Sequence, residues 1–88
     1  MKNIKNVTII DYGMGNIASI ERAFQAIGST TTVTSDHKII ESSDRIILPG
    51  VGGFGDSMSE LNKYDLIEPI KNFVKTGKPL LGICLGMQ

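Results

Sequence analysis

The residue of this 88-residue chain best suited to covalent chemistry is its single cysteine, Cys84, which lies in the segment Gly82-Ile83-Cys84-Leu85-Gly86. The spacing Gly-x-Cys-x-Gly is the cysteine counterpart of the Gly-x-Ser-x-Gly elbow, in which a nucleophile occupies a sharp strand-to-helix turn. Gly82 and Gly86 fit such a turn, because the residues two before and two after the nucleophile approach each other closely. A helix starting at Cys84 would favour the thiolate through its N-terminal dipole. A lone cysteine is also commonly a small apolar residue of a core, so Cys84 by itself is equally consistent with packing.

Two glycine-rich segments favour a different interpretation. Gly13-x-Gly15-x-x-Ala18 fits the dinucleotide fingerprint, and Asp36 lies about 20 residues further on, where a ribose-binding acid would be expected. A second match, Gly50-x-Gly52-x-x-Gly55, weakens the fingerprint, because glycines cluster at tight strand-to-helix turns in any α/β protein. A non-catalytic nucleotide-binding α/β module is therefore the alternative to an enzyme.

Composition excludes several classes of function. Nine basic and nine acidic residues give a net charge of zero, which argues against a nucleic-acid or anionic-membrane binder. One cysteine and one histidine exclude an internal disulfide and a Cys/His zinc site. No apolar run approaches the roughly 18 residues that span a bilayer, and the first six residues lack the apolar core of a signal peptide. We therefore expect a globular, cytoplasmic protein without a metal or cofactor.

The elements that position these residues follow from the apolar pattern. The predicted strands are 7–11, 30–34, 46–48 and 79–83, the third of them stopped by Pro49. The first predicted helix runs from Asn16 to Ile27, with Asn16 as N-cap and Gly28 as stop. A short helical turn starts at Ser35-Asp36 and includes Ile39 and Ile40. Two further helices are predicted, one capped by Asp56 or Ser57 that reaches Leu61, and one from Leu66 to Thr76. Strands separated by helices predict an α/β fold with a doubly wound, mostly parallel sheet. The single domain looks incomplete, because no helix follows the last strand.

Three motifs resemble one enzyme family. Gly82-Ile83-Cys84-Leu85-Gly86-Met87-Gln88 resembles the nucleophile motif of the class I (triad) glutamine amidotransferases, and Leu48-Pro49-Gly50-Val51-Gly52-Gly53-Phe54 resembles their oxyanion-strand motif. Asp11-Tyr12-Gly13-Met14-Gly15-Asn16, followed by Ser19, resembles the opening of one branch, the glutaminase subunits of imidazole glycerol phosphate synthase in histidine biosynthesis. The resemblance covers the chain in order. It implies a flavodoxin-like sheet in which residues 1–88 form the N-terminal part of a single amidotransferase domain.

The resemblance also implies a mechanism. Cys84 would attack the side-chain carboxamide of glutamine, form a glutamyl thioester and release ammonia, after which water hydrolyses the thioester to glutamate. The oxyanion would be bound by the backbone N–H groups of Leu85 and, after a peptide rearrangement, of Val51. The residues implied in binding glutamine are Gly50, Gly52 and Gln88.

The partner implied by the resemblance is a synthase (cyclase) subunit with a (β/α)₈ barrel, which uses the ammonia to close the imidazole ring. The residues expected to face this partner are those of the first loop, Tyr12, Gly13, Met14, Gly15 and Asn16.

The sequence departs from the family in one respect. The family's triad also needs a His and a Glu, in a His-x-Glu arrangement well downstream of the cysteine, and these 88 residues do not contain it. His37, the only histidine, lies among polar residues after the second predicted strand, so we expect it at the surface. Losing a positioned base costs about 10²–10⁴ in rate. We therefore expect an N-terminal fragment that is inactive alone.

Overall fold

The computed structural model describes residues 6–13, 17–50 and 61–84, with side chains described as far as Leu81. Four strands form one parallel sheet in the order β2-β1-β3-β4. The strands are β1 (Asn6–Ile10), β2 (Thr30–Thr34), β3 (Ile46–Gly50) and β4 (Leu80–Cys84). The described helices are α1 (Ile17–Ala26), α2 (His37–Ser42) and α4 (Ile67–Lys75), and residues 61–63 are also helical. The predicted α/β class is confirmed.

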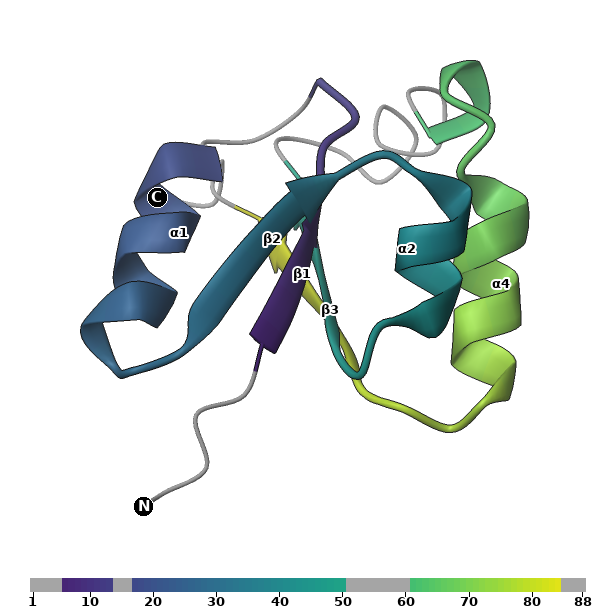
Figure 1. The fold of residues 1–88 in the computed structure, drawn as a ribbon. Coiled ribbons are helices and arrows are strands. Elements are labelled where there is room, and N and C mark those ends of the chain that lie inside the picture. The colour runs from purple at the N-terminus through teal and green to yellow at the C-terminus, as the bar shows by residue number, and fades with distance from the viewer. Residues whose placement is uncertain (1–5, 14–16, 51–60, 85–88) are drawn as a thin grey trace.

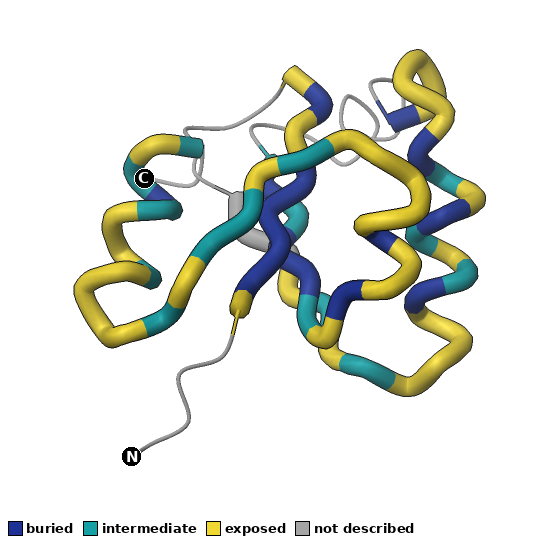
Figure 2. The backbone as a smooth tube through the Cα atoms, in the orientation of Figure 1, coloured by how far each residue is buried: buried dark blue, intermediate teal, exposed yellow. Residues whose placement is uncertain are grey.

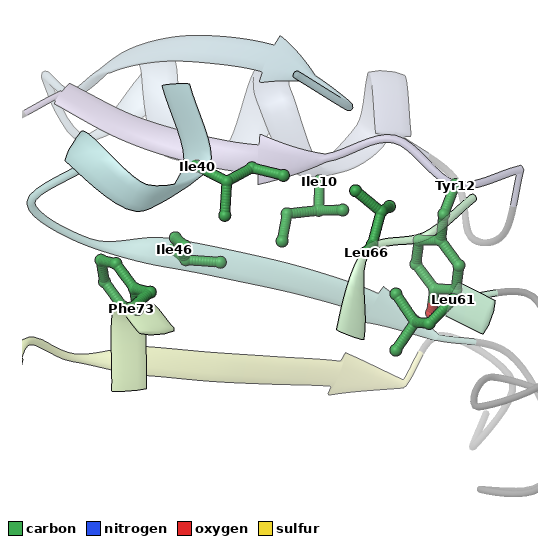
Figure 3. Packing of buried hydrophobic residues seen from close by; sticks show 7 residues of the cluster. All are labelled: Ile10, Tyr12, Ile40, Ile46, Leu61, Leu66 and Phe73. Atoms are coloured by element: carbon green, nitrogen blue, oxygen red, sulfur yellow. The ribbon is translucent and has the colours of Figure 1, made fainter. Parts of the chain in front are cut away.

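Helices lie on both faces of the sheet (Figure 1). Alternate strand residues point to opposite faces, so β1 and β3 each supply side chains to two clusters. On the α1 face the buried residues are Val7, Ile9, Ile20 and Ile47. On the face covered by α2 and α4 they are Ile10, Tyr12, Ile40, Ile46, Leu61, Leu66 and Phe73 (Figure 3). The resulting burial is strongest along β1, which lies between two other strands and between two layers of helices (Figure 2).

Helix positions agree with the sequence pattern, but two large apolar residues, Ile27 and Val74, are exposed. Gly28 and Gly77 have φ of +93° and +81° just after α1 and α4, as predicted for left-handed stops. Ile27 lies beyond the end of α1 and is 76% exposed. Val74 is 52% exposed, because it follows Phe73 by one residue and so lies about 100° around the helix from the buried stripe. The predicted cap at Asp56 or Ser57 lies outside the described residues.

The prediction that Pro49 stops the third strand is wrong. β3 continues through Pro49 to Gly50, and both residues remain in register with β4, opposite Ile83 and Cys84. Proline is tolerated in a strand where its missing N–H has no ladder partner. The β1 ladder ends at the Ile9–Ile47 pair, so Pro49 lies beyond the point at which β1 needs a donor from β3.

Candidate active site

The two motifs that resemble amidotransferase motifs meet at the carboxyl ends of neighbouring strands. In the β3–β4 register Gly50 lies opposite Cys84, and Pro49 lies opposite Ile83. Paired strands lie about 4.8 Å apart. The end of the predicted oxyanion strand is therefore held beside the backbone of the predicted nucleophile, although the two residues are 34 positions apart in the sequence. Cys84 is the last residue of β4, as a strand-to-helix elbow requires.

The strand order independently indicates that a ligand site would lie at the same edge of the sheet. The connection from β1 leads through α1 to β2 on one side, and the connection from β3 leads through α4 to β4 on the other. β1 and β3 are neighbours, so the crossovers diverge between their carboxyl ends. In open parallel sheets ligands bind outside the strand ends at such a switch point. The loop after β1, the end of β3 and the end of β4 all lie at this edge (Figure 1).

Tyr12 lies at this edge, but its side chain is turned into the protein. It was expected to face a partner subunit; in the structure the side chain is fully buried, and its hydroxyl donates a hydrogen bond to the carbonyl oxygen of Pro49. The ring packs with Leu61 and Leu66 in the cluster on the α2 and α4 face (Figure 3). The Tyr12 side chain thus links the first loop to the end of β3 and presents no exposed surface to a partner.

Gly13 occupies a tight turn next to Tyr12. Its φ is +85°, and its N–H donates to Oδ1 of Asp11 at 3.3 Å. This Asx turn reverses the chain directly after β1. Gly13 is exposed, while Met14, Gly15 and Asn16 lie outside the described residues. The partner contact itself stays a prediction.

Several predicted site residues lie outside the described part of the chain. They are Val51 and Leu85, expected to supply the oxyanion hole, and Gly52 and Gln88, expected to bind glutamine. Gly50 is described and half-buried at the end of β3. The structure therefore brings together the strand ends that carry these residues, and their individual roles stay predictions.

Asp36 serves a structural purpose that does not favour the dinucleotide interpretation. Its side chain caps α2 by accepting from the backbone N–H groups of Lys38 at 2.9 Å and Ile39 at 3.3 Å. A carboxylate occupied in this way accounts for the acid after β2 without a ribose. His37, the first residue of α2, is exposed, as expected.

The described residues lack two other kinds of feature. In these ranges no group of three or more His, Cys, Asp or Glu side chains is arranged to hold a metal ion. Of the helices in the same ranges, none is both long enough and apolar enough to cross a membrane.

The Tyr12 hydrogen bond is the feature of this edge that the sequence analysis missed. The available signal was a tyrosine that follows a buried strand, in a fold whose neighbouring strand has a proline near its carboxyl end. Both residues belong to the ends of adjacent parallel strands, so they had to lie close together. The direction of the tyrosine side chain, however, depends on packing against residues 61 and 66, far along the chain.

Comparison with known proteins connects this geometry to a family. An imidazole glycerol phosphate synthase subunit HisH of Rhodopirellula baltica is 50% identical over 82 residues, which are 93% of this chain and 40% of that protein. A subunit HisH 1 of Legionella pneumophila is 51% identical over 85 residues, which are 97% of this chain and 40% of that protein. The subunit HisH of Sulfurimonas denitrificans is 51% identical over 82 residues.

The chain thus spans about 40% of the length of the curated relatives that it matches. The family model of the class-I glutamine amidotransferases matches residues 8–88, from the middle of β1 through the cysteine motif. On this match, and with a parallel sheet that sets Gly50 beside Cys84, the chain belongs to the class-I glutamine amidotransferase family.

Proposed function

We propose that this chain is the N-terminal part of a single glutaminase domain, which hydrolyses glutamine and supplies ammonia to the synthase subunit of an imidazole glycerol phosphate synthase in histidine biosynthesis. The observation that carries the proposal is the register that sets Gly50 opposite Cys84. It joins the predicted nucleophile and the predicted oxyanion strand at one edge of the sheet. The printed names of the relatives, each a subunit of that synthase, support the choice of partner and pathway.

In the proposed reaction the Cys84 thiolate attacks the carboxamide carbon of glutamine. The tetrahedral intermediate collapses as the carbon–nitrogen bond breaks and the nitrogen takes up a proton, which leaves a glutamyl thioester and free ammonia. Water then attacks the thioester, so glutamate is released and the thiol is restored. Both tetrahedral steps require oxyanion donors, for which we propose the N–H groups of Val51 and Leu85.

The remaining roles follow from the same assignment. Gly50, Gly52 and Gln88 are proposed to bind glutamine beside Cys84. The exposed Gly13 and the following residues 14–16 are proposed to face the synthase subunit, which receives the ammonia in the cytoplasm. The general base is a histidine oriented by a glutamate, and both must come from the part of the protein that the 88 residues do not include.

The test is nitrogen-donor dependence in the full-length protein bound to its synthase. We expect Cys84→Ala to abolish product formation with glutamine, because no thioester can form. The same complex supplied with ammonium salt at alkaline pH should form product at the wild-type rate, since free ammonia reaches the synthase from solution. The measurement is product formation with each nitrogen donor in turn.

His37→Ala is the matched control, because His37 is the only histidine of these 88 residues and histidine is the side chain that most often serves as a general base. Its exposed position at the start of α2 predicts wild-type turnover with either donor. Glutamine-dependent turnover that survives Cys84→Ala would contradict the proposed mechanism. A wild-type complex that never uses glutamine would favour the nucleotide-binding alternative.

A further inference from the structure

The hydrogen bond between Tyr12 and Pro49 joins two strand ends that the sheet itself no longer joins. Tyr12 lies two residues beyond β1, and Pro49 is the residue before Gly50, at the end of β3. Both side chains are fully buried. Figure 3 shows the Tyr12 ring reaching from the end of β1 down to β3, beside Leu61.

The Pro49 carbonyl needs a donor that β1 cannot supply. Backbone groups along a strand point alternately to its two neighbours. The carbonyl of Arg45 accepts from Thr8 of β1, whereas the N–H of Ile46 donates to Pro79 on the β4 side. By this alternation Ile47 and Pro49 face β1, but the β1 ladder ends at the Ile9–Ile47 pair. The Tyr12 hydroxyl therefore replaces a backbone N–H at the first position beyond the ladder.

This bond fixes the peptide that leads into the site. The proline ring restricts φ of Pro49, and a bound carbonyl also restricts its ψ. The plane of the Pro49–Gly50 peptide is then held from the β1 side by Tyr12 and from the β4 side by pairing with Ile83 and Cys84. The next residue, Gly50, lies opposite Cys84.

On the proposed function, we infer that Tyr12 is a positioning residue for glutamine hydrolysis: its hydroxyl holds the end of β3 at a fixed place beside Cys84. The hydroxyl is buried and hydrogen-bonded to the Pro49 carbonyl, so on this inference it acts through the backbone rather than on glutamine itself. Its effect is on the geometry of the backbone that must stabilise the oxyanion, where a displacement of about 1 Å can cost as much as 10²-fold in rate. The same hydrogen bond explains why Tyr12 faces inward from a loop that was expected to face a partner.

The test is Tyr12→Phe in the full-length subunit bound to its synthase, because phenylalanine keeps the buried ring and removes only the hydroxyl. We expect kcat for glutamine hydrolysis to fall about tenfold, with KM for glutamine within about twofold of wild type. Ammonium-dependent product formation should not change, because the synthase and its docking surface are untouched. Each rate is measured at a temperature at which circular dichroism shows the variant to be folded.

Thr8→Val is the matched control for loss of a buried hydroxyl. Thr8 is 2% exposed, and its hydroxyl pairs with that of Ser43 at 2.7 Å. The Ser43 hydroxyl gives its hydrogen to the carbonyl of Ile39, so Thr8 is the donor. Thr8 pairs with Ile46 at the opposite end of β3 from Gly50. Thr8→Val should lower the melting temperature about as much as Tyr12→Phe and leave kcat unchanged.

Three results would overturn the inference. A Tyr12→Phe complex with wild-type kcat shows that the hydroxyl serves stability alone. A rise in KM at unchanged kcat shows an effect on binding, and a Tyr12→Phe protein that fails to fold while Thr8→Val folds shows a requirement of the fold. Failure of the proposed function is distinct from all three, because it would appear as a wild-type complex that does not hydrolyse glutamine.

Discussion

At the scale of single residues, the spacing of residue types was a better guide to where site residues lie than to what their side chains contact. The Gly-x-Cys-x-Gly pattern predicted a cysteine at the end of a strand, and Cys84 is the last residue of β4. Tyr12 shows why the rest could not be predicted. Its hydroxyl binds a carbonyl 37 residues away, and that pairing depends on a strand register that local sequence does not contain. Asp36 likewise fits a ribose-binding pattern, but its carboxylate caps a helix.

Gly13 gives a test at this scale. A side chain at its φ of +85° is strained, and an added Cβ would also lie 3.1 Å from the hydroxyl oxygen of Tyr64. We expect Gly13→Ala to lower the free energy of unfolding of the full-length protein by about 1–2 kcal/mol. The measurement is equilibrium denaturation in urea.

Gly77→Ala is the control, because Gly77 has nearly the same φ, +81°, and nothing lies within 4 Å of an added Cβ. The loss of stability in Gly77→Ala therefore measures only the free-energy cost of placing a side chain at this positive φ. Gly13→Ala should cost at least as much, and combining it with Tyr64→Phe should remove the excess. A Gly13→Ala protein more stable than Gly77→Ala would show that the close approach of Tyr64 carries no energy.

At the scale of elements, apolar periodicity predicted every described strand to within two residues, but errors occurred where a tertiary partner overrides a local rule. Proline is a strand breaker in sequence, yet β3 runs through Pro49 because β4 continues beside it and β1 does not. The short helical turn predicted from Ser35 is the helix α2, closed by its Asp36 cap and by the N–H of Ser43, which donates to the carbonyl of Ile40. Such endings depend on contacts rather than on propensity.

Removal of the Asp36 cap tests how much α2 depends on it. We expect Asp36→Ala to lower the free energy of unfolding by about 1 kcal/mol, because two backbone N–H groups at the helix start lose their acceptor. The helix has only six residues and holds Ile40 in the core, so these two N–H groups are a large share of the backbone donors in it. Asp36→Asn and Asp36→Ser keep an acceptor oxygen and should lose at most a few tenths of that amount. Equal losses in all three variants would mean that charge, not capping, is responsible.

At the scale of the whole molecule, the sequence predicted a parallel sheet wound on both faces but not its strand order. Right-handed crossovers allow the chain to move either way from β1. The order β2-β1-β3-β4 shows that it turns back after β2, which puts the switch point between β1 and β3. That reversal, which no local pattern encodes, is what gathers the first loop, the end of β3 and Cys84 at one edge.

One exposed apolar side chain marks a part of the sheet that none of the described helices covers. Leu81 of β4 is 52% exposed. It pairs with Ile47, whose side chain belongs to the α1 face, so Leu81 lies on the same face. α1 itself contacts β1 and β2, and within the described ranges no helix covers β4 on this side. The chain spans about 40% of the relatives that it matches, and the rest of those proteins is long enough to supply such a cover.

We therefore expect Leu81 to be covered in the full-length protein, so that Leu81→Lys places a charge in an apolar contact and lowers the free energy of unfolding by about 2 kcal/mol or more. Val74→Lys is the matched control: Val74 is also 52% exposed, but it lies on α4 beside the buried stripe of that helix. It should change stability by no more than about 0.5 kcal/mol, as surface substitutions usually do. Urea denaturation of the two variants compares them directly. If Leu81→Lys proved as harmless as Val74→Lys, the α1 face over β4 would be open to solvent in the whole protein too, and the elements beyond these 88 residues would have to pack elsewhere.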